Sequence, residues 1–307
     1  MGRCSWFLGA VFLFTPIDFS SAIVLFSQEN DANLANPENG LPWDNVVQMR
    51  NESGPIGTGV YLGNRYVLTA GHVGPLTSVK VGFVDYLLES SPAVAIGTAD
   101  MKLVRLASDP GLSGIRLNSN PAGDGGNSYL VGYGVGRASG SLLGSSPVVW
   151  GDSSTAIKRW GTNFVDGAIA GVQVGGYTSD LLRTQFNSNA GINEAALTIY
   201  DSGSALFRQI GSEWYLVGIG AYVQNSKFSF ASTQFNSNES DDSYFIRISS
   251  YASSVQQIEA VLVSKPYSRN LFCVEGFSWR LLDWPTSCIS LALRNLLFSF
   301  PRYSCGG

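Results

Sequence analysis

Residues 57–74, GTGVYLGNRYVLTAGHVG, indicate the fold class of this 307-residue chain. Two runs of β-branched and aromatic residues flank the dipeptide Gly63-Asn64, which is typical of a tight hairpin turn. Similar runs recur at residues 128–135, 213–223 and 243–248, separated by clusters of Gly, Ser and Asn. Short strands punctuated in this way predict an all-β protein built from antiparallel barrels or sandwiches.

One helix is expected after the last of these runs. The segment SSYASSVQQIEAVL places four apolar residues three or four positions apart, as one face of an amphipathic helix requires. These residues are Tyr251, Val255, Ile258 and Leu262. We expect Ser249 or Ser250 to cap the start of the helix and the helix to close the domain.

The composition limits the classes of function. Only 14% of the residues are charged and the formal net charge is −4. The chain therefore lacks the basic surface that non-specific nucleic-acid binding needs, and we expect no nucleic-acid partner. Its single histidine, His72, excludes any metal site with two imidazole ligands. We expect neither a metal nor another cofactor.

The first 22 residues have the layout of a secretory signal. Arg3 precedes an apolar stretch at residues 6–17, and small residues lead to a cleavage point after Ala22. An N-terminal core helix is the alternative, although Pro16 would end it. We expect a secreted, extracellular or periplasmic protein. No later segment has about 18 uninterrupted apolar residues, so we also expect no transmembrane helix.

Residues 261–307 differ from the rest of the chain. They hold three of the four cysteines and five basic residues against two acidic ones. Residues 23–260 contain no cysteine and carry a formal charge of −7, from 13 basic and 20 acidic residues. The central domain is therefore no disulfide scaffold. Three interpretations of the tail stay open: an appended module, an anchoring segment, or read-through. It has no C-x-x-C spacing, which argues against a metal site.

Three short segments carry residue types suited to nucleophilic catalysis. VLTAGH runs from a strand into a small-residue turn that ends at His72, and DMKLVRL opens a strand with Asp100. DSGSALF places Ser202 in a glycine turn that feeds another strand. Each segment alone also fits a structural histidine, a capping carboxylate or an ordinary turn. Their combination in one strand-rich chain indicates a serine nucleophile with an imidazole base.

These segments resemble the trypsin/chymotrypsin-like serine peptidases, in particular a bacterial secreted branch. TAGH resembles the family motif T-A-A-H, and the Asp100 segment resembles D-x-x-L-x-x-L. Asp201-Ser202-Gly203 resembles the core of G-D-S-G-G. The resemblance spans residues 23–260 in family order. It implies two packed six-stranded antiparallel β-barrels with a C-terminal helix and an active site between the barrels.

The resemblance also implies a mechanism. His72 would take the proton of the Ser202 hydroxyl, and Asp100 would hold the imidazole during formation of an acyl-enzyme. The backbone N–H groups of Tyr200 and Ser202 would form the oxyanion hole. We therefore expect a secreted serine endopeptidase, most simply a monomer, that hydrolyses protein or peptide substrates.

Tyr200 departs from the family pattern, which has glycine there. If the backbone at this position has a positive φ, a tyrosine adds strain of about 1–2 kcal/mol. The peptide could instead reverse and remove one oxyanion donor. A catalytically inactive homologue that acts as a protein-binding module is therefore the alternative function. An esterase of the α/β-hydrolase class is excluded, because no G-x-S-x-G surrounds Ser202.

The expected specificity pocket also departs from trypsin. Ala196 stands six residues before the serine, where trypsin-like pockets have aspartate, so preference for Lys or Arg is not supported. Ala221 and Val223 lie in the segment that replaces the family's Ser-Trp-Gly wall. The bulk of Val223 favours small apolar side chains at the cleavage site.

The predicted signal suggests a route to activation. Animal members of the family create an Ile-Val terminus, and its ammonium pairs with the aspartate before the catalytic serine. Cleavage after Ala22 would expose Ile23, whose ammonium could pair with Asp201. A disordered start is an equally open alternative.

Overall fold

The computed structural model describes residues 23–25, 32–90, 93–136, 152–186, 190–223 and 242–264. The predicted signal at residues 1–22 lies outside this part of the chain, as does the predicted tail from residue 265 onward. Helix α1 (Ile248–Ser264) runs past residue 260, where we expected the domain to end. In the described ranges, no helix has the length and apolar character needed to cross a membrane.

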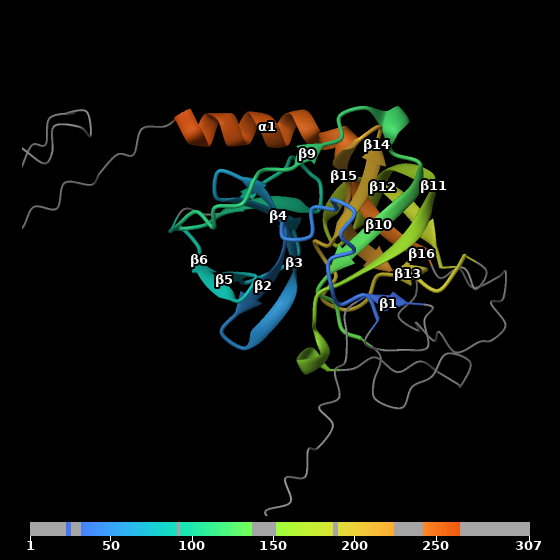
Figure 1. Cartoon of the computed structure of the whole chain (residues 1–307). Helices are drawn as coiled ribbons and strands as arrows, with labels where there is room; N and C mark the ends of the chain where they lie inside the picture. The colour runs from blue at the N-terminus through green and yellow to red at the C-terminus, as the bar shows by residue number, and fades with distance from the viewer. Residues whose placement is uncertain are drawn as a thin grey trace, which may run out of the picture. The chain divides into compact units, whose positions relative to one another are not determined.

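The N-terminal half of the described chain forms an antiparallel sheet in the order β6-β5-β2-β3-β4-β8-β7 (Figure 1). Its strands are β2 (Val46–Asn51), β3 (Gly54–Gly63), β4 (Tyr66–Ala70), β5 (Ser78–Val81), β6 (Val84–Leu87), β7 (Val94–Ala95) and β8 (Met101–Arg105). An isolated bridge joins Leu88, just after β6, to Leu106, just after β8. The N–H of Glu89 also donates to the Arg105 carbonyl at 2.8 Å. These bonds connect the two ends of the run from β6 to β8, so this sheet curls into a barrel.

The second sheet closes on itself. Its order is β14-β10-β11-β12-β16-β15, and β15 pairs back with β14, while β9 adds to β15 in parallel. Its strands are β9 (Arg116–Leu117), β10 (Gly126–Gly132), β11 (Arg159–Val174), β12 (Tyr177–Gln185), β14 (Ala205–Ile210), β15 (Glu213–Val223) and β16 (Asp242–Arg247). The short strands β1 (Val24–Leu25) and β13 (Ala195–Ala196) pair separately. Two 3-10 turns, η1 (Pro121–Gly123) and η2 (Ser153–Thr155), complete the described elements. The predicted all-β fold with two antiparallel barrels and a C-terminal helix is confirmed, and the second barrel closes through six strands.

The hairpin in the opening stretch is confirmed, but its turn lies one residue later than predicted. Gly63 pairs with Tyr66, so the two central residues are Asn64 and Arg65. Both have positive φ, 50° and 71°, as a type I′ turn requires. Asn tolerates this conformation well, and the Arg65 N–H is held by the Tyr61 hydroxyl at 3.2 Å.

Helix α1 is confirmed, but neither predicted serine caps it. The helix begins at Ile248, and its Ser249 hydroxyl donates to Asp124 at 2.7 Å. The Ser250 hydroxyl donates to Asp180 at 2.9 Å. Both serines therefore tie the helix to the second barrel. Ile248, Ala252 and Val255 are fully buried, with Tyr251 and Ile258 packed against the same core.

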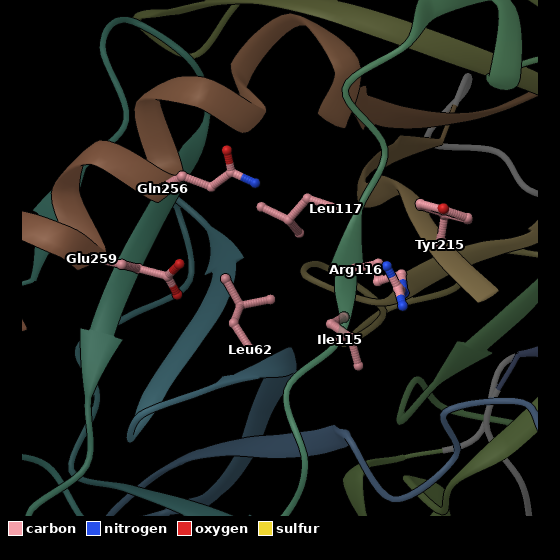
Figure 2. Close-up of a pocket in the computed structure, with 7 residues that line it drawn as sticks. All are labelled: Leu62, Ile115, Arg116, Leu117, Tyr215, Gln256 and Glu259. Carbon is pink, nitrogen blue, oxygen red and sulfur yellow. The ribbon is translucent and has the colours of Figure 1, made fainter. Parts of the chain in front are cut away.

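A cavity of about 250 Å³ lies beside helix α1 (Figure 2). Gln256 and Glu259 of the helix line it together with Leu62 and residues 115–117. Burial raises the pKa of Glu259 to about 7. The cavity is smaller than the roughly 300–1,000 Å³ of most small-molecule sites, and none of the candidate site residues lines it.

Candidate active site

His72 lies two residues beyond the end of β4, in a turn that is held from both sides. Its backbone N–H donates to Asp100 Oδ1 at 2.8 Å. The Lys102 ammonium donates to the carbonyl of Gly71 at 3.0 Å and to that of Val73. The residues before and after the histidine are thus both anchored to β8, which fixes the direction of the imidazole.

Asp100 is fully buried directly before β8. Its Oδ2 lies 2.6 Å from His72 Nδ1 and 2.7 Å from the Tyr222 hydroxyl. Burial acts to raise the pKa of the Asp100 carboxyl, but hydrogen bonds from the His72 ring and the Tyr222 hydroxyl outweigh it and lower that pKa below its ordinary value. The group is therefore a carboxylate near neutral pH. Because a carboxylate only accepts hydrogen bonds, His72 Nδ1 must be the donor.

Ser202 completes the line of polar groups from the other barrel. Its Oγ lies 2.7 Å from His72 Nε2. With the ring proton on Nδ1, Nε2 is an acceptor and takes a hydrogen bond from the serine hydroxyl. Asp100 and Ser202 lie 28 and 130 positions after His72 in the sequence. The three predicted catalytic residues therefore meet in one hydrogen-bonded row.

The fold requires a glycine directly after Ser202. Gly203 has φ +89°, and a Cβ there would overlap the carbonyl oxygen of Thr58 and the hydroxyl of Thr69. The Thr58 N–H donates to the Ser202 carbonyl at 2.8 Å. The serine turn therefore lies directly against β3, which brings Ser202 within reach of the histidine on the first barrel.

The backbone φ of Tyr200 is +71°. This is the left-handed conformation that would strain a tyrosine at this position. The carbonyl before it, on Ile199, accepts a hydrogen bond from the Val135 N–H at 2.8 Å. Its own carbonyl accepts one from Thr58 Oγ1 at 3.0 Å. Within the described part of the chain, no acceptor takes the N–H of Tyr200 or of Ser202. Because the Ile199 carbonyl is bound, the peptide is held with the Tyr200 N–H free for a ligand.

Asp201 is a second fully buried carboxyl, directly before Ser202. It accepts hydrogen bonds from the Gly134 N–H at 2.7 Å and from the N–H and hydroxyl of Thr198, both at 2.9 Å. Burial raises its pKa to about 7, although these hydrogen bonds and the charge of Arg159 oppose the rise. Arg159 also donates to the carbonyl of Ile23 at 3.0 Å. The direct pairing of an Ile23 ammonium with Asp201 concerns a processed chain and stays a prediction.

Of the three predicted pocket residues, Ala196 and Ala221 are buried and Val223 is half-buried. Ala196 is fully buried and pairs with Val24 between β13 and β1. Val223 packs against a hydrophobic cluster that contains Ala195 and Leu197. Ala221 belongs to a different and larger hydrophobic cluster. These contacts define no open pocket, so the preference for small apolar side chains also stays a prediction.

Two residues at the site were missed from the sequence. Thr58 holds the carbonyls of both Tyr200 and Ser202, and Tyr222 donates to Asp100. Thr58 lies in the stretch quoted first, but a threonine in a strand carries no chemical signature. Tyr222 lies between the predicted pocket residues Ala221 and Val223, and nothing in the sequence indicates that its hydroxyl binds Asp100.

We compared the chain with known protein families, curated proteins and solved structures. No family model and no curated protein matches the chain. Among solved structures, neuropsin, a serine protease expressed in the limbic system of mouse brain, matches with a TM-score of 0.51 and 15% identity over 74% of this chain and 98% of its own. The Rv3671c protease from M. tuberculosis, in its active form, has a TM-score of 0.49 and 15% identity over 80% of this chain and 94% of its own. The match to neuropsin shows that the chain has the two-barrel chymotrypsin fold of the trypsin-like serine proteases.

Proposed function

We propose that this chain is a serine endopeptidase that cleaves peptide bonds through Ser202, His72 and Asp100. The observation that carries the proposal is the continuous hydrogen-bonded row from Asp100 Oδ2 through both ring nitrogens of His72 to Ser202 Oγ, with distances of 2.6 and 2.7 Å. A serine hydroxyl is a poor nucleophile at neutral pH and needs an adjacent base. This row supplies the base and a group that orients it.

In the first half of the reaction, Ser202 Oγ attacks the carbonyl carbon of the scissile peptide while His72 Nε2 takes its proton. The imidazolium that forms is stabilised by the Asp100 carboxylate on its other side. His72 then gives the proton to the leaving amine, the C–N bond breaks, and an ester on Ser202 remains.

In the second half, a water molecule attacks that ester. His72 Nε2 takes a proton from the water, and the Ser202 oxygen recovers it as the acid product leaves. Each half passes through a tetrahedral oxyanion. The free N–H groups of Tyr200 and Ser202 are the donors available for it, and removal of one such donor typically lowers the rate by about 10²–10³.

A catalytically silent binding module is the second candidate, because Tyr200 is a non-glycine residue at a φ of +71°, and reversal of the peptide would relieve that strain while removing one oxyanion donor. Such strain persists only where the surroundings hold it, at a cost of about 1–3 kcal/mol. Here the tethers from Val135 and Thr58 hold the peptide with its N–H free, which supports the enzyme. The two functions differ in a single measurable property, turnover.

The remaining parts of the proposal rest on the sequence. We propose export through the signal at residues 1–22, activation by the new terminus at Ile23, and a preference for small apolar side chains set by Ala196, Ala221 and Val223. N-terminal sequencing of the protein recovered outside the producing cell tests export and the cleavage point, because the protein should begin at Ile23. Adding one residue before Ile23 should abolish activity, and an unaffected enzyme would refute activation by this terminus.

The proposed activity is tested with a mixture of peptides that covers all residues at each position. Mass spectrometry of the products should show new termini inside the peptides, after small apolar residues. Ser202→Ala, which removes only the nucleophilic oxygen, is the matched control and should give none. A folded wild-type protein that leaves the mixture intact contradicts the proposal and favours the binding module.

A further inference from the structure

Tyr222 joins the second barrel to the pair formed by His72 and Asp100. It lies near the end of β15, and its hydroxyl donates to Asp100 Oδ2 at 2.7 Å. This oxygen also receives the Nδ1–H of His72, at 2.6 Å. The phenol ring lies over the imidazole with 6.2 Å between ring centroids and 23° between ring planes.

We propose that Tyr222 is a positioning residue of the triad, which fixes the Asp100 carboxylate through its hydroxyl and the His72 ring through its face. The inference rests on the proposed function, because it assigns a task within the same site. It does not depend on whether Ala221 and Val223, on either side of Tyr222, form the predicted specificity pocket.

The hydrogen bonds to Asp100 show why this hydroxyl matters. Oδ1 accepts the backbone N–H of His72, which comes from the turn that carries the imidazole itself. Oδ2 accepts only the imidazole and the Tyr222 hydroxyl among the described residues. Without the phenol, the imidazole alone would hold the oxygen that must in turn orient it. Tyr222 therefore supplies the independent fixed point.

The shared oxygen also gives Tyr222 an electrostatic effect. A hydrogen bond from the phenol withdraws part of the negative charge of Oδ2, so the carboxylate stabilises an imidazolium less strongly. Burial and the bond to Asp100 raise the pKa of Tyr222, so the hydroxyl remains a donor throughout the neutral range. Removing it should strengthen the hold of Asp100 on the ring proton and keep His72 protonated to a higher pH.

Two other titratable groups lie around this pair. The Lys102 ammonium feels the charge of Asp100, but its hydrogen bonds go to the carbonyls of Gly71 and Val73. Tyr177, at the start of β12, is an uncharged phenol in the neutral range and donates no hydrogen bond to Asp100 among the described residues. The Ser179 hydroxyl accepts the backbone N–H of Asp100 at 2.9 Å and does not reach the carboxylate. None of these groups replaces the missing donor.

The test compares Tyr222→Phe, which keeps the ring and removes the hydroxyl, with the wild-type chain. Tyr86→Phe in β6 is the matched control, because it removes a phenol hydroxyl from the far edge of the first barrel. His72 is the only histidine in the chain, so every imidazole signal in an NMR titration belongs to it. The same samples give kcat/KM as a function of pH on a cleaved peptide.

In Tyr222→Phe, we expect the midpoint of the imidazole titration to rise by at least about half a pH unit. The acidic limb of the pH–rate profile should follow it, and kcat/KM at pH 7 should fall about tenfold, mostly through kcat. Tyr86→Phe should match the wild type in both. A purely structural role of Tyr222 would lower the melting temperature and leave the titration midpoint unchanged.

Site-specific replacement of Tyr222 by 3-fluorotyrosine provides a second test that keeps the side chain in place. The more acidic phenol donates a stronger hydrogen bond, so the imidazole midpoint should move to lower pH, opposite to Tyr222→Phe. Unchanged titrations in both variants overturn the inference. A wild-type protein that cleaves no peptide refutes the proposed function instead, and the titration reports on Tyr222 independently of that result.

Discussion

Thr58→Val isolates the contact that holds the proposed oxyanion hole. Thr58 is fully buried in β3, and its Oγ1 donates to the Tyr200 carbonyl at 3.0 Å and accepts the Tyr133 N–H at 2.9 Å. Valine has nearly the same shape and lacks the oxygen. The variant therefore removes two hydrogen bonds at once, while the backbone bond from Thr58 to Ser202 is kept.

The size of the effect follows from these two bonds. A buried polar group left without its partner costs about 1–3 kcal/mol, so the free energy of unfolding should fall by about 3 kcal/mol. For a domain of this length, each kcal/mol lowers the melting temperature by about 2–4 °C, which gives about 6–12 °C. The Tyr200 carbonyl, next to a backbone φ of +71°, then loses the hydrogen bond that Thr58 Oγ1 donates to it, while the Val135 N–H still holds the preceding carbonyl. Because loss of one oxyanion donor costs about 10²–10³ in rate, we expect kcat to fall about 10- to 100-fold with KM little changed.

The assay combines thermal unfolding with steady-state cleavage of a peptide that the wild type accepts. Thr58→Ser, which retains the hydroxyl, is the control and should stay within about threefold of wild-type kcat. A Thr58→Val protein with wild-type kcat refutes the reasoning that this threonine holds the donor at Tyr200. An equal loss of kcat in Thr58→Ser would show that packing of the methyl group, and not the hydroxyl, is responsible.

Two further predictions concern the same turn. Gly203→Ala should lower the free energy of unfolding by roughly 3 kcal/mol or more, because the added Cβ would overlap the Thr58 carbonyl and the backbone φ is +89°. Urea unfolding measures this loss, and a loss under about 1 kcal/mol would contradict the prediction. Burial raises the pKa of Asp201 to about 7, so the folded state retains a proton that the unfolded state releases near pH 4. Stability from this group is therefore full below about pH 4 and is lost as the pH rises to about 7, by on the order of 4 kcal/mol. Glu259, whose pKa burial also raises to about 7, adds a slope of the same sign to both proteins. Urea unfolding across this range should therefore show a steeper loss of stability in the wild type than in Asp201→Asn, and parallel curves would count against the prediction.

The three candidate catalytic residues could be found from the sequence because their chemistry sits in short local motifs. His72, Asp100 and Ser202 each lie within three residues of the end of a strand, in a turn or strand entry that the sequence marks. Tyr222 and Thr58 could not be found in this way. Their partners lie 122 and 142 positions away, across the two barrels, and nothing local marks a phenol or a threonine for such a contact.

The same limit explains the local errors in the fold. Ser249 and Ser250 have the residue type of a helix cap, but Asp124 and Asp180 of the second barrel take their hydroxyls. The turn of the first hairpin shifted by one residue because Arg65 adopts a positive φ that its side chain does not favour. The Arg65 carbonyl accepts the N–H of Leu106, 41 positions away, at 2.8 Å. In each case a contact between distant segments outweighed the local preference.

Reaction of Ser202 with a fluorophosphonate probe tests the central claim most directly. Such probes form a stable adduct with a serine only where a base activates it and donors receive the developing oxyanion. The account predicts a single adduct, mapped to Ser202 by peptide mass spectrometry, which is absent in Ser202→Ala and strongly reduced in His72→Ala. A folded wild-type protein that forms no adduct, or one whose adduct lies on another residue, would contradict the account.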